Sequence, residues 1–184
     1  FGDIRIMFPM ISSLEEVLSA KAMVEKAKAA LKAEGIAYNE AIKLGIMIEI
    51  PVAAICADIL AKEVDFFSIG TNDLIQYSCA VDRINDKIAS LYRPLHPGVL
   101  RLIKMAADAA KANGIECGVC GEMAGSRGMA SVLCGLGVTN LSMSASSILA
   151  AKSDLAHHTY EECVTLANSL LGGHSATENE SSFG

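Results

Sequence analysis

Short apolar runs alternate with longer amphipathic stretches along the whole chain. A short run that is apolar on both faces predicts a buried strand, whereas apolar residues spaced three and four positions apart predict a helix. We predict strands over residues 5–10, 44–50, 65–70, 116–120 and 140–144, and helices over 14–31, 51–63, 73–80, 97–113, 126–136 and 159–171.

Local signals support several of these boundaries. Ser12 or Ser13, with Glu15 or Glu16 three residues later, predicts a capping box at the start of the first helix. Gly35 is a typical residue for the end of that helix. Pro51 suits the first turn of the second helix, because its missing N–H would have no partner there.

Strands that are each followed by a helix indicate parallel strands joined by crossover helices. The predicted class is therefore α/β. We expect residues 1–171 to form one domain. Residues 172–184 are polar and without periodicity, which predicts a disordered tail.

Composition and charge limit the classes of protein to which the chain can belong. The chain has 184 residues, of which 52% are hydrophobic, and 15 Lys and Arg against 21 Asp and Glu give a formal net charge of −6. This predicts one globular unit with a sizeable core. We expect no membrane segment and no nucleic-acid binding, because charges interrupt the apolar runs and basic clusters are missing. The absence of a signal sequence favours the cytoplasm. The chain begins without Met in an apolar run, so we expect it to be part of something longer.

Six cysteines occur, mostly inside apolar runs, and are interpreted as reduced core residues. Cys117 and Cys120 form a C-x-x-C motif. A redox or zinc role would require a cationic helix start or a second ligand pair, and the sequence has neither.

Polar residues follow three of the predicted strands. Glu49 ends the second strand, Thr71, Asn72 and Asp73 follow the third, and Cys120 ends the fourth between two glycines. In parallel α/β proteins the ligand binds beyond the carboxyl ends of the strands. These positions are therefore the candidate site.

Glu49 and Asp73 lie one strand–helix unit apart, so they can meet at one rim. Two carboxylates suit Mg²⁺, which keeps several waters and completes its shell with substrate oxygens. Asn72 could hydrogen-bond that substrate. Alternatively, Glu49 could be a buried acid paired with a Lys or Arg, and Asp73 could cap the following helix.

Two further residues have alternative interpretations. Cys120 could be an acid, a base or a nucleophile, or simply a core residue. Arg83 lies in an irregular segment and could contact an anionic ligand through two parallel hydrogen bonds. From the residues alone, an exposed salt bridge is the preferred interpretation of Arg83.

Five sequence blocks resemble the carboxyl-terminal part of the Enzyme I family of the bacterial sugar phosphotransferase system. The blocks cover residues 6–10, 45–49, 66–74, 80–83 and 119–125. The resemblance extends over residues 4–171. Pyruvate phosphate dikinase and phosphoenolpyruvate (PEP) synthase share the Glu, Asn-Asp and Cys-Gly-Glu blocks, whereas Ala-Val-Asp-Arg is more similar to Enzyme I.

The resemblance implies a (β/α)₈ barrel that binds PEP and Mg²⁺ at the carboxyl ends of its strands. It implies that Glu49 and Asp73 bind the metal and that Asn72 and Asp73 contact PEP. Arg83 would bind the phosphate of PEP, and Cys120 would be the catalytic proton donor.

The resemblance also implies partners outside this segment. In the family the phosphoryl group passes to a histidine on an amino-terminal domain and then to a phosphocarrier protein, with release of pyruvate. The resemblance also implies that this region forms a homodimer. The chain has five predicted strands, whereas a closed barrel needs eight. It also lacks that histidine and two family arginines that bind the substrate. We therefore expect a fragment that does not complete turnover alone.

Two alternatives remain at this point. One is a pyruvate phosphate dikinase or PEP synthase type of enzyme that acts on pyruvate and a nucleotide. The other is a non-catalytic module for dimerisation or ligand binding. In either case, five strands would leave apolar edges unpaired, so we expect dimerisation, aggregation or an open partial barrel.

Overall fold

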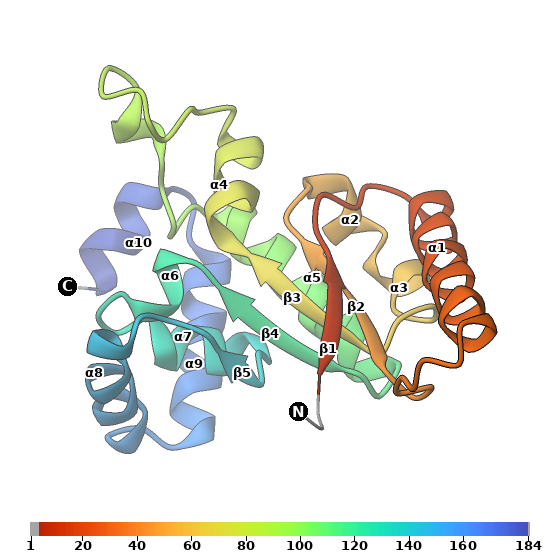
Figure 1. Cartoon of the computed structure of the whole chain (residues 1–184). Coiled ribbons are helices and arrows are strands. Elements are labelled where there is room, and N and C mark those ends of the chain that lie inside the picture. The colour runs from red at the N-terminus through yellow and green to blue at the C-terminus, as the bar shows by residue number, and fades with distance from the viewer. Residues whose placement is uncertain (1–3, 184) are drawn as a thin grey trace.

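A computed structural model of the protein describes residues 4–183 and contains one parallel sheet (Figure 1). Its strands pair in chain order, β1-β2-β3-β4-β5, and every described pairing is parallel. The strands are β1 (Arg5–Phe8), β2 (Lys43–Ile48), β3 (Phe66–Gly70), β4 (Glu116–Cys120) and β5 (Asn140–Leu141). The predicted α/β class and the five strands are confirmed.

Helices connect successive strands and follow the last one. They are α1 (Leu14–Ala33), α2 (Pro51–Ile55), α3 (Ala57–Leu60), α4 (Thr71–Cys79), the 3₁₀ turn η1 (Ala89–Leu91), α5 (Pro97–Ala112), α6 (Glu122–Gly125), α7 (Met129–Leu136), α8 (Ala145–Ala156), α9 (Tyr160–Gly172) and α10 (Ala176–Phe183). This order of strands and crossover helices places the carboxyl ends of all five strands at one rim.

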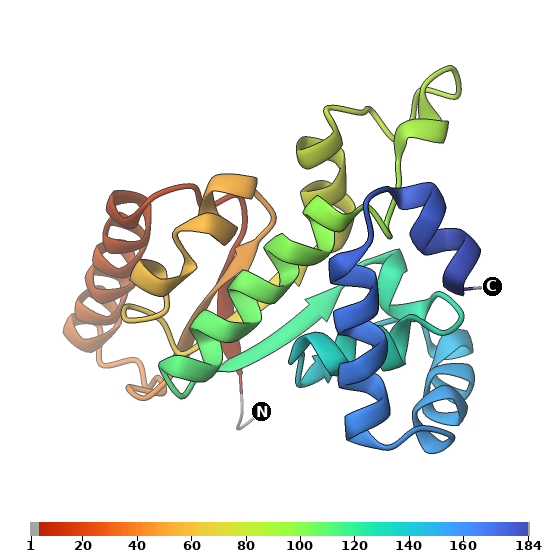
Figure 2. The same cartoon turned by 180° about the vertical axis from the view of Figure 1, so that it is seen from behind.

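Helix α5 lies against β3 and β4 on one face of the sheet, and α9 packs against α5 and α7, as the view from behind shows (Figure 2). Strand side chains on that face, such as Ile46, Ile69 and Val119, are buried in the hydrophobic core. The opposite face is more open. Met7 is 37% exposed there. The hollow on that face has a volume of about 620 Å³, and Arg5, Met7, Phe66, Ser68, Gly118 and Leu141 are among its lining residues.

Most of the predicted helix-start residues lie where the sequence placed them. The first capping box uses Ser13 and Glu16, each accepting a hydrogen bond from a backbone N–H of the other. Pro51 lies in the first turn of α2. The same box recurs at α9, where Thr159 and Glu162 cap the helix. The start of each of these helices is thus determined by a few consecutive residues.

Two predicted helices differ from the structure in detail, and one helix was missed. The helix predicted over 51–63 is divided at Cys56 into α2 and α3. The helix predicted from residue 126 begins only at Met129, because Gly128 adopts a left-handed φ of 73°. Helix α8 was not predicted at all. None of its residues is buried, so it lacks the apolar stripe on which the prediction depends.

The disordered tail predicted for residues 172–184 is wrong for its described part, since Ala176–Phe183 forms α10. Polar contacts hold this helix in place. The Asn179 side chain is 2% exposed, and its amide donates to the carbonyl oxygens of Leu95 and Leu170, both at 2.9 Å. Hydrophobic periodicity does not register such contacts. The folded unit therefore continues beyond the predicted domain end at residue 171.

Among residues 4–183, none of the helices combines the length and the hydropathy needed to cross a lipid bilayer.

Candidate active site at the carboxyl-end rim

Strand register brings the predicted site residues to one rim. Ile48 pairs with Ile69, and Gly70 pairs with Cys120. The residues that follow these pairs, Glu49 on one strand and Thr71 to Asp73 on the next, therefore emerge side by side.

Glu49 is a buried carboxylate, with the residue only 3% exposed. Its Oε1 accepts a hydrogen bond from the backbone N–H of Met10 at 2.7 Å. Met10 has a left-handed φ of 57°, an uncommon conformation for a residue with a side chain. Gly70 is needed beside it, because a Cβ there would lie 2.8 Å from Glu49 Oε2.

Asp73 lies in the first turn of α4, close to Glu49. Burial raises the pKa of Glu49 above its ordinary value, and the charge of Asp73 raises it further, although the Met10 N–H acts in the opposite direction. The two carboxylates therefore repel each other when both are ionised.

The two alternative roles of these carboxylates do not fit the structure. Helix α4 begins after Gly70 without a side-chain cap, so Asp73 is not its N-cap. Within the described part of the chain, Glu49 forms no salt bridge with Lys or Arg.

The carboxylate oxygens of Glu49 and Asp73 are donor atoms that suit a hard divalent cation. Residues 4–183 contain no group of three or more His, Cys, Asp or Glu side chains placed to hold a metal. Two carboxylates are nevertheless enough for Mg²⁺, whose other ligands are commonly water and substrate oxygens. A cation between Glu49 and Asp73 would also relieve their mutual repulsion.

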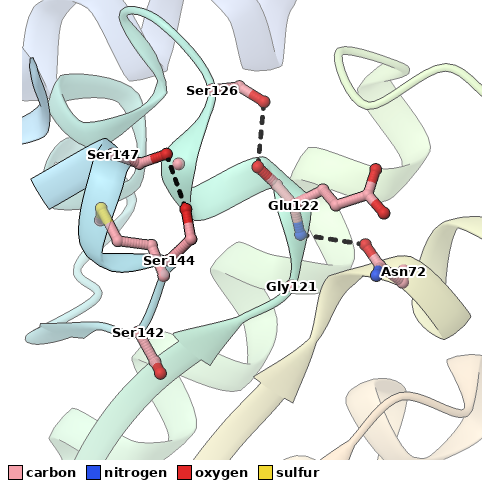
Figure 3. A pocket seen from close by; sticks show the side chains of 9 residues that line it. Asn72, Gly121, Glu122, Ser126, Ser142, Ser144 and Ser147 are labelled. Carbon is pink, nitrogen blue, oxygen red and sulfur yellow. Dashed lines mark hydrogen bonds between the residues drawn. The ribbon is translucent and has the colours of Figure 1, made fainter.

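Asn72 is held by two hydrogen bonds to the same atom. Its Oδ1 accepts from the backbone N–H of Glu122 at 3.1 Å and from the hydroxyl of Tyr92 at 3.3 Å. Figure 3 shows the first of these contacts at the edge of a hollow of about 440 Å³. The hollow is also lined by Ser126, Ser142, Ser144 and Ser147. It is large enough for a small anionic ligand.

The Cys120 thiol is half-buried at the end of β4. The Ser68 hydroxyl donates to Cys120 Sγ at 3.5 Å, and Sγ lies 3.7 Å from the carbonyl oxygen of Ile69. The Thr71 hydroxyl donates to the Cys120 carbonyl oxygen at 3.1 Å. The thiol is thus held at the rim among polar groups, and its environment is not that of a core cysteine.

Cys117 has a different environment, although it shares the C-x-x-C motif with Cys120. It is buried, and burial raises the pKa of its thiol to about 12. Residues three apart in a strand point to opposite faces of the sheet. The two thiols therefore point away from each other, and Cys117 lies outside the rim where Cys120 is placed.

Arg83 reaches the rim from the irregular segment after α4. Its Nη1 lies 3.6 Å from Glu122 Oε1, and both side chains are exposed, at 39% and 80%. This is the exposed salt bridge that the residues alone favoured. Its partner, however, is the residue whose backbone N–H contacts Asn72, so the guanidinium lies next to the candidate site.

Sequence reasoning did not assign a role to several rim residues. Tyr92, Ser68 and Glu122 each contact a predicted site residue through one hydrogen bond or ion pair. Ser68 could have been found, because it lies two residues before Gly70, which pairs with Cys120, and so shares a sheet face with that pair. Tyr92 had no such signal, because the segment that places it has no regular period.

Carboxylates, an amide and a thiol gathered at the carboxyl-end rim of a parallel sheet are the arrangement typical of ligand sites in barrel-type α/β proteins. A solved citrate lyase from Burkholderia xenovorans LB400 is similar in structure, with a TM-score of 0.55 and 19% identity. The likeness covers 96% of this chain and 60% of that one. It confirms the predicted α/β fold with a five-stranded parallel sheet, which is consistent with part of a (β/α)₈ barrel.

Sequence comparison defines the family more narrowly. The family described as "PEP-utilising enzyme, PEP-binding domain" matches residues 1–160, and the chain belongs to this family. Proteins named phosphoenolpyruvate-protein phosphotransferase are similar to it. That of Listeria monocytogenes serovar 1/2a is 49% identical over 97% of this chain. That of Staphylococcus carnosus is 52% identical over 83%. The chain spans 31% of the Listeria protein and 26% of the Staphylococcus protein.

Proposed function

We propose that the chain is the PEP-binding segment of a phosphoenolpyruvate-protein phosphotransferase of the sugar phosphotransferase system. The observation that carries the proposal is the buried carboxylate of Glu49, which has Asp73 beside it and no cationic partner among the described residues. The shared name of the similar proteins favours this activity over a pyruvate dikinase.

In this proposal Glu49 and Asp73 hold Mg²⁺. The bound cation would supply positive charge that stabilises negative charge on the transferred phosphoryl group and on the enol oxygen of PEP. The Met10 N–H orients Glu49 for this task, because its hydrogen bond occupies Oε1 and leaves Oε2 free of that contact.

Asn72, Asp73 and Arg83 bind the substrate in this proposal. The amide NH₂ of Asn72 donates to an oxygen of PEP. The guanidinium of Arg83 leaves the exposed carboxylate of Glu122 and pairs with the phosphate, for which its planar fork of donors is well suited. Because Glu122 is 80% exposed, the salt bridge that must break is weak.

Cys120 is the proposed proton donor. When the bond between phosphorus and the enol oxygen breaks, its electron pair stays on that oxygen and leaves the enolate of pyruvate. The phosphoryl group moves to a histidine outside this chain. The Cys120 thiol then gives its proton to the methylene carbon, which forms a C–H bond and leaves a thiolate. The Ser68 hydroxyl, which donates to Sγ, stabilises that thiolate.

The remaining partners are part of the same proposal. They are the histidine of an amino-terminal domain, the phosphocarrier protein that receives the phosphoryl group, and a second copy of the chain in a homodimer. We place this activity in the cytoplasm. The isolated chain is expected not to complete phosphoryl transfer, because the accepting histidine lies elsewhere.

Calorimetric titration of PEP in the presence of Mg²⁺ tests the site. Glu49→Gln and Asp73→Asn should each weaken PEP binding at least about tenfold, because each removes one of two metal carboxylates. Asp58→Asn, on the exposed surface of α3, is the matched control and should bind as the unmodified chain does. Unchanged binding in both rim variants would contradict a metal-dependent PEP site and favour a non-catalytic module.

A further inference from the structure

The oxygen of the Asn72 amide is identified by its neighbours. A backbone N–H can only donate, so the Asn72 atom 3.1 Å from Glu122 N must be the carbonyl oxygen. The Tyr92 hydroxyl donates to this same oxygen. The amide NH₂ makes no hydrogen bond with the described residues, and Asn72 lines the hollow of Figure 3. Both N–H groups of the amide are therefore available to a ligand.

Tyr92 is suited to remain a donor. Burial first, and the negative charge of Glu122 second, raise the pKa of Tyr92 to about 12. At physiological pH the phenol is therefore protonated. Its hydroxyl hydrogen is therefore available to Asn72 Oδ1 throughout the neutral pH range.

Helix α10 anchors the backbone that carries Tyr92. Arg93 Nε and Nη2 contact the two carboxylate oxygens of Glu180 at 2.7 and 2.6 Å. Arg93 Nη2 also donates to the Thr177 hydroxyl at 3.0 Å. Asn179 donates to the Leu95 carbonyl oxygen at 2.9 Å. The residues immediately after Tyr92 are thus tied to α10 through a two-point ion pair and a buried amide.

We propose that Tyr92 is a positioning residue that holds the Asn72 amide with its NH₂ toward the ligand, and that α10 keeps Tyr92 in place. The inference rests on the proposed function, in which Asn72 donates to PEP. Tyr92 itself touches Asn72 rather than the substrate. If the Asn72 amide rotated so that its oxygen and NH₂ group exchanged places, the oxygen would face the ligand. An anion would then meet an acceptor instead of two donors.

Nuclear magnetic resonance tests this orientation without any ligand. In ¹⁵N-labelled chain, the side-chain NH₂ signal of Asn72 is identified by its loss in Asn72→Asp. In Tyr92→Phe the order parameter of this NH₂ group should fall, because one of two hydrogen bonds to Oδ1 is lost. Tyr160→Phe is the matched control, since its hydroxyl has no hydrogen bond within residues 4–183. An unchanged Asn72 signal in a folded Tyr92→Phe variant would overturn the proposal.

A titration with PEP and Mg²⁺ then tests the consequence. Tyr92→Phe should weaken PEP binding about two- to tenfold, the range that corresponds to one net hydrogen bond. Glu180→Gln should also lower the order parameter of the Asn72 NH₂ group, although Glu180 lies outside the site. A loosened amide with unchanged PEP affinity would overturn the ligand-facing role. If the unmodified chain binds no PEP, the proposed function fails, while the resonance experiment still decides the role of Tyr92.

Discussion

Glycines determine how closely the rim side chains approach one another. Gly121 has a φ of 113°, which residues with a side chain rarely adopt. A Cβ at this position would lie 2.5 Å from Thr71 Oγ1 and 3.0 Å from Asn72 Oδ1. The contact between the ends of β3 and β4 therefore requires glycine, and the amide of Asn72 could not occupy its place beside a larger residue.

At the residue scale, the raised pKa of Tyr92 leads to a spectroscopic prediction. The chain has four tyrosines. In an alkaline titration followed by ultraviolet absorbance, one phenol should ionise late, near pH 12, and this step should be lost in Tyr92→Phe. Because the raised pKa lies above the ordinary value of 10, stability from the neutral phenol is present below pH 10 and is lost as pH rises toward 12. Loss of the late step in Tyr160→Phe instead would contradict the assignment.

At the element scale, helix starts depend on side chains within a few residues, whereas α10 depends on distant ones. The capping boxes of α1 and α9 join residues three apart. In contrast, the bond from Asn179 to Leu95 spans 84 residues. The first kind of contact is visible in a sequence motif. The second exists only once α9 and the segment before α5 have packed together.

The capping box of α1 predicts a pH effect. Hydrogen bonds from Ser12, and then Ser13, lower the pKa of Glu16. The stability that this carboxylate contributes is therefore present above its ordinary value of 4.5 and is lost as pH falls through the lowered pKa. Glu16→Gln should lower the urea midpoint at neutral pH and have less effect at an acid pH low enough for the carboxylate to have taken up its proton.

Glu15→Gln is the control for this measurement. Glu15 lies in the same first turn of α1 but makes no hydrogen bond among the described residues. Its variant should show no comparable pH dependence. Equal loss of stability by Glu16→Gln at both pH values would show that the charge of Glu16 is not what stabilises the cap.

At the scale of the whole molecule, the sheet has one covered and one open face. The open face carries Met7 at 37% exposure beside Phe66, and β1 and β5 are the edge strands within residues 4–183. Exposed edges and apolar sheet faces favour association with another chain. The 184-residue chain should therefore self-associate through this face.

Sedimentation velocity over a range of concentrations measures that association. Met7→Lys should lower the association constant by roughly tenfold or more, since a buried Met side chain contributes about 1.5–3 kcal/mol. Met23→Lys is the control, because Met23 is 73% exposed on α1, outside this face. A chain that remains monomeric at all concentrations, or an equal effect of both variants, would contradict association through the open face.

The sequence by itself determined the strands, their parallel order and the strand ends where Glu49, Asn72, Asp73 and Cys120 lie. These features follow from periods and spacings of a few residues, which a single stretch of chain contains. Only the tertiary structure decided which groups hold those residues in place. The hydrogen bonds of Met10 to Glu49 and of Tyr92 to Asn72 join residues 39 and 20 positions apart. Helix α10 is likewise held in place by the Asn179 amide, which donates to carbonyl oxygens on two segments that lie beside it only in the folded chain.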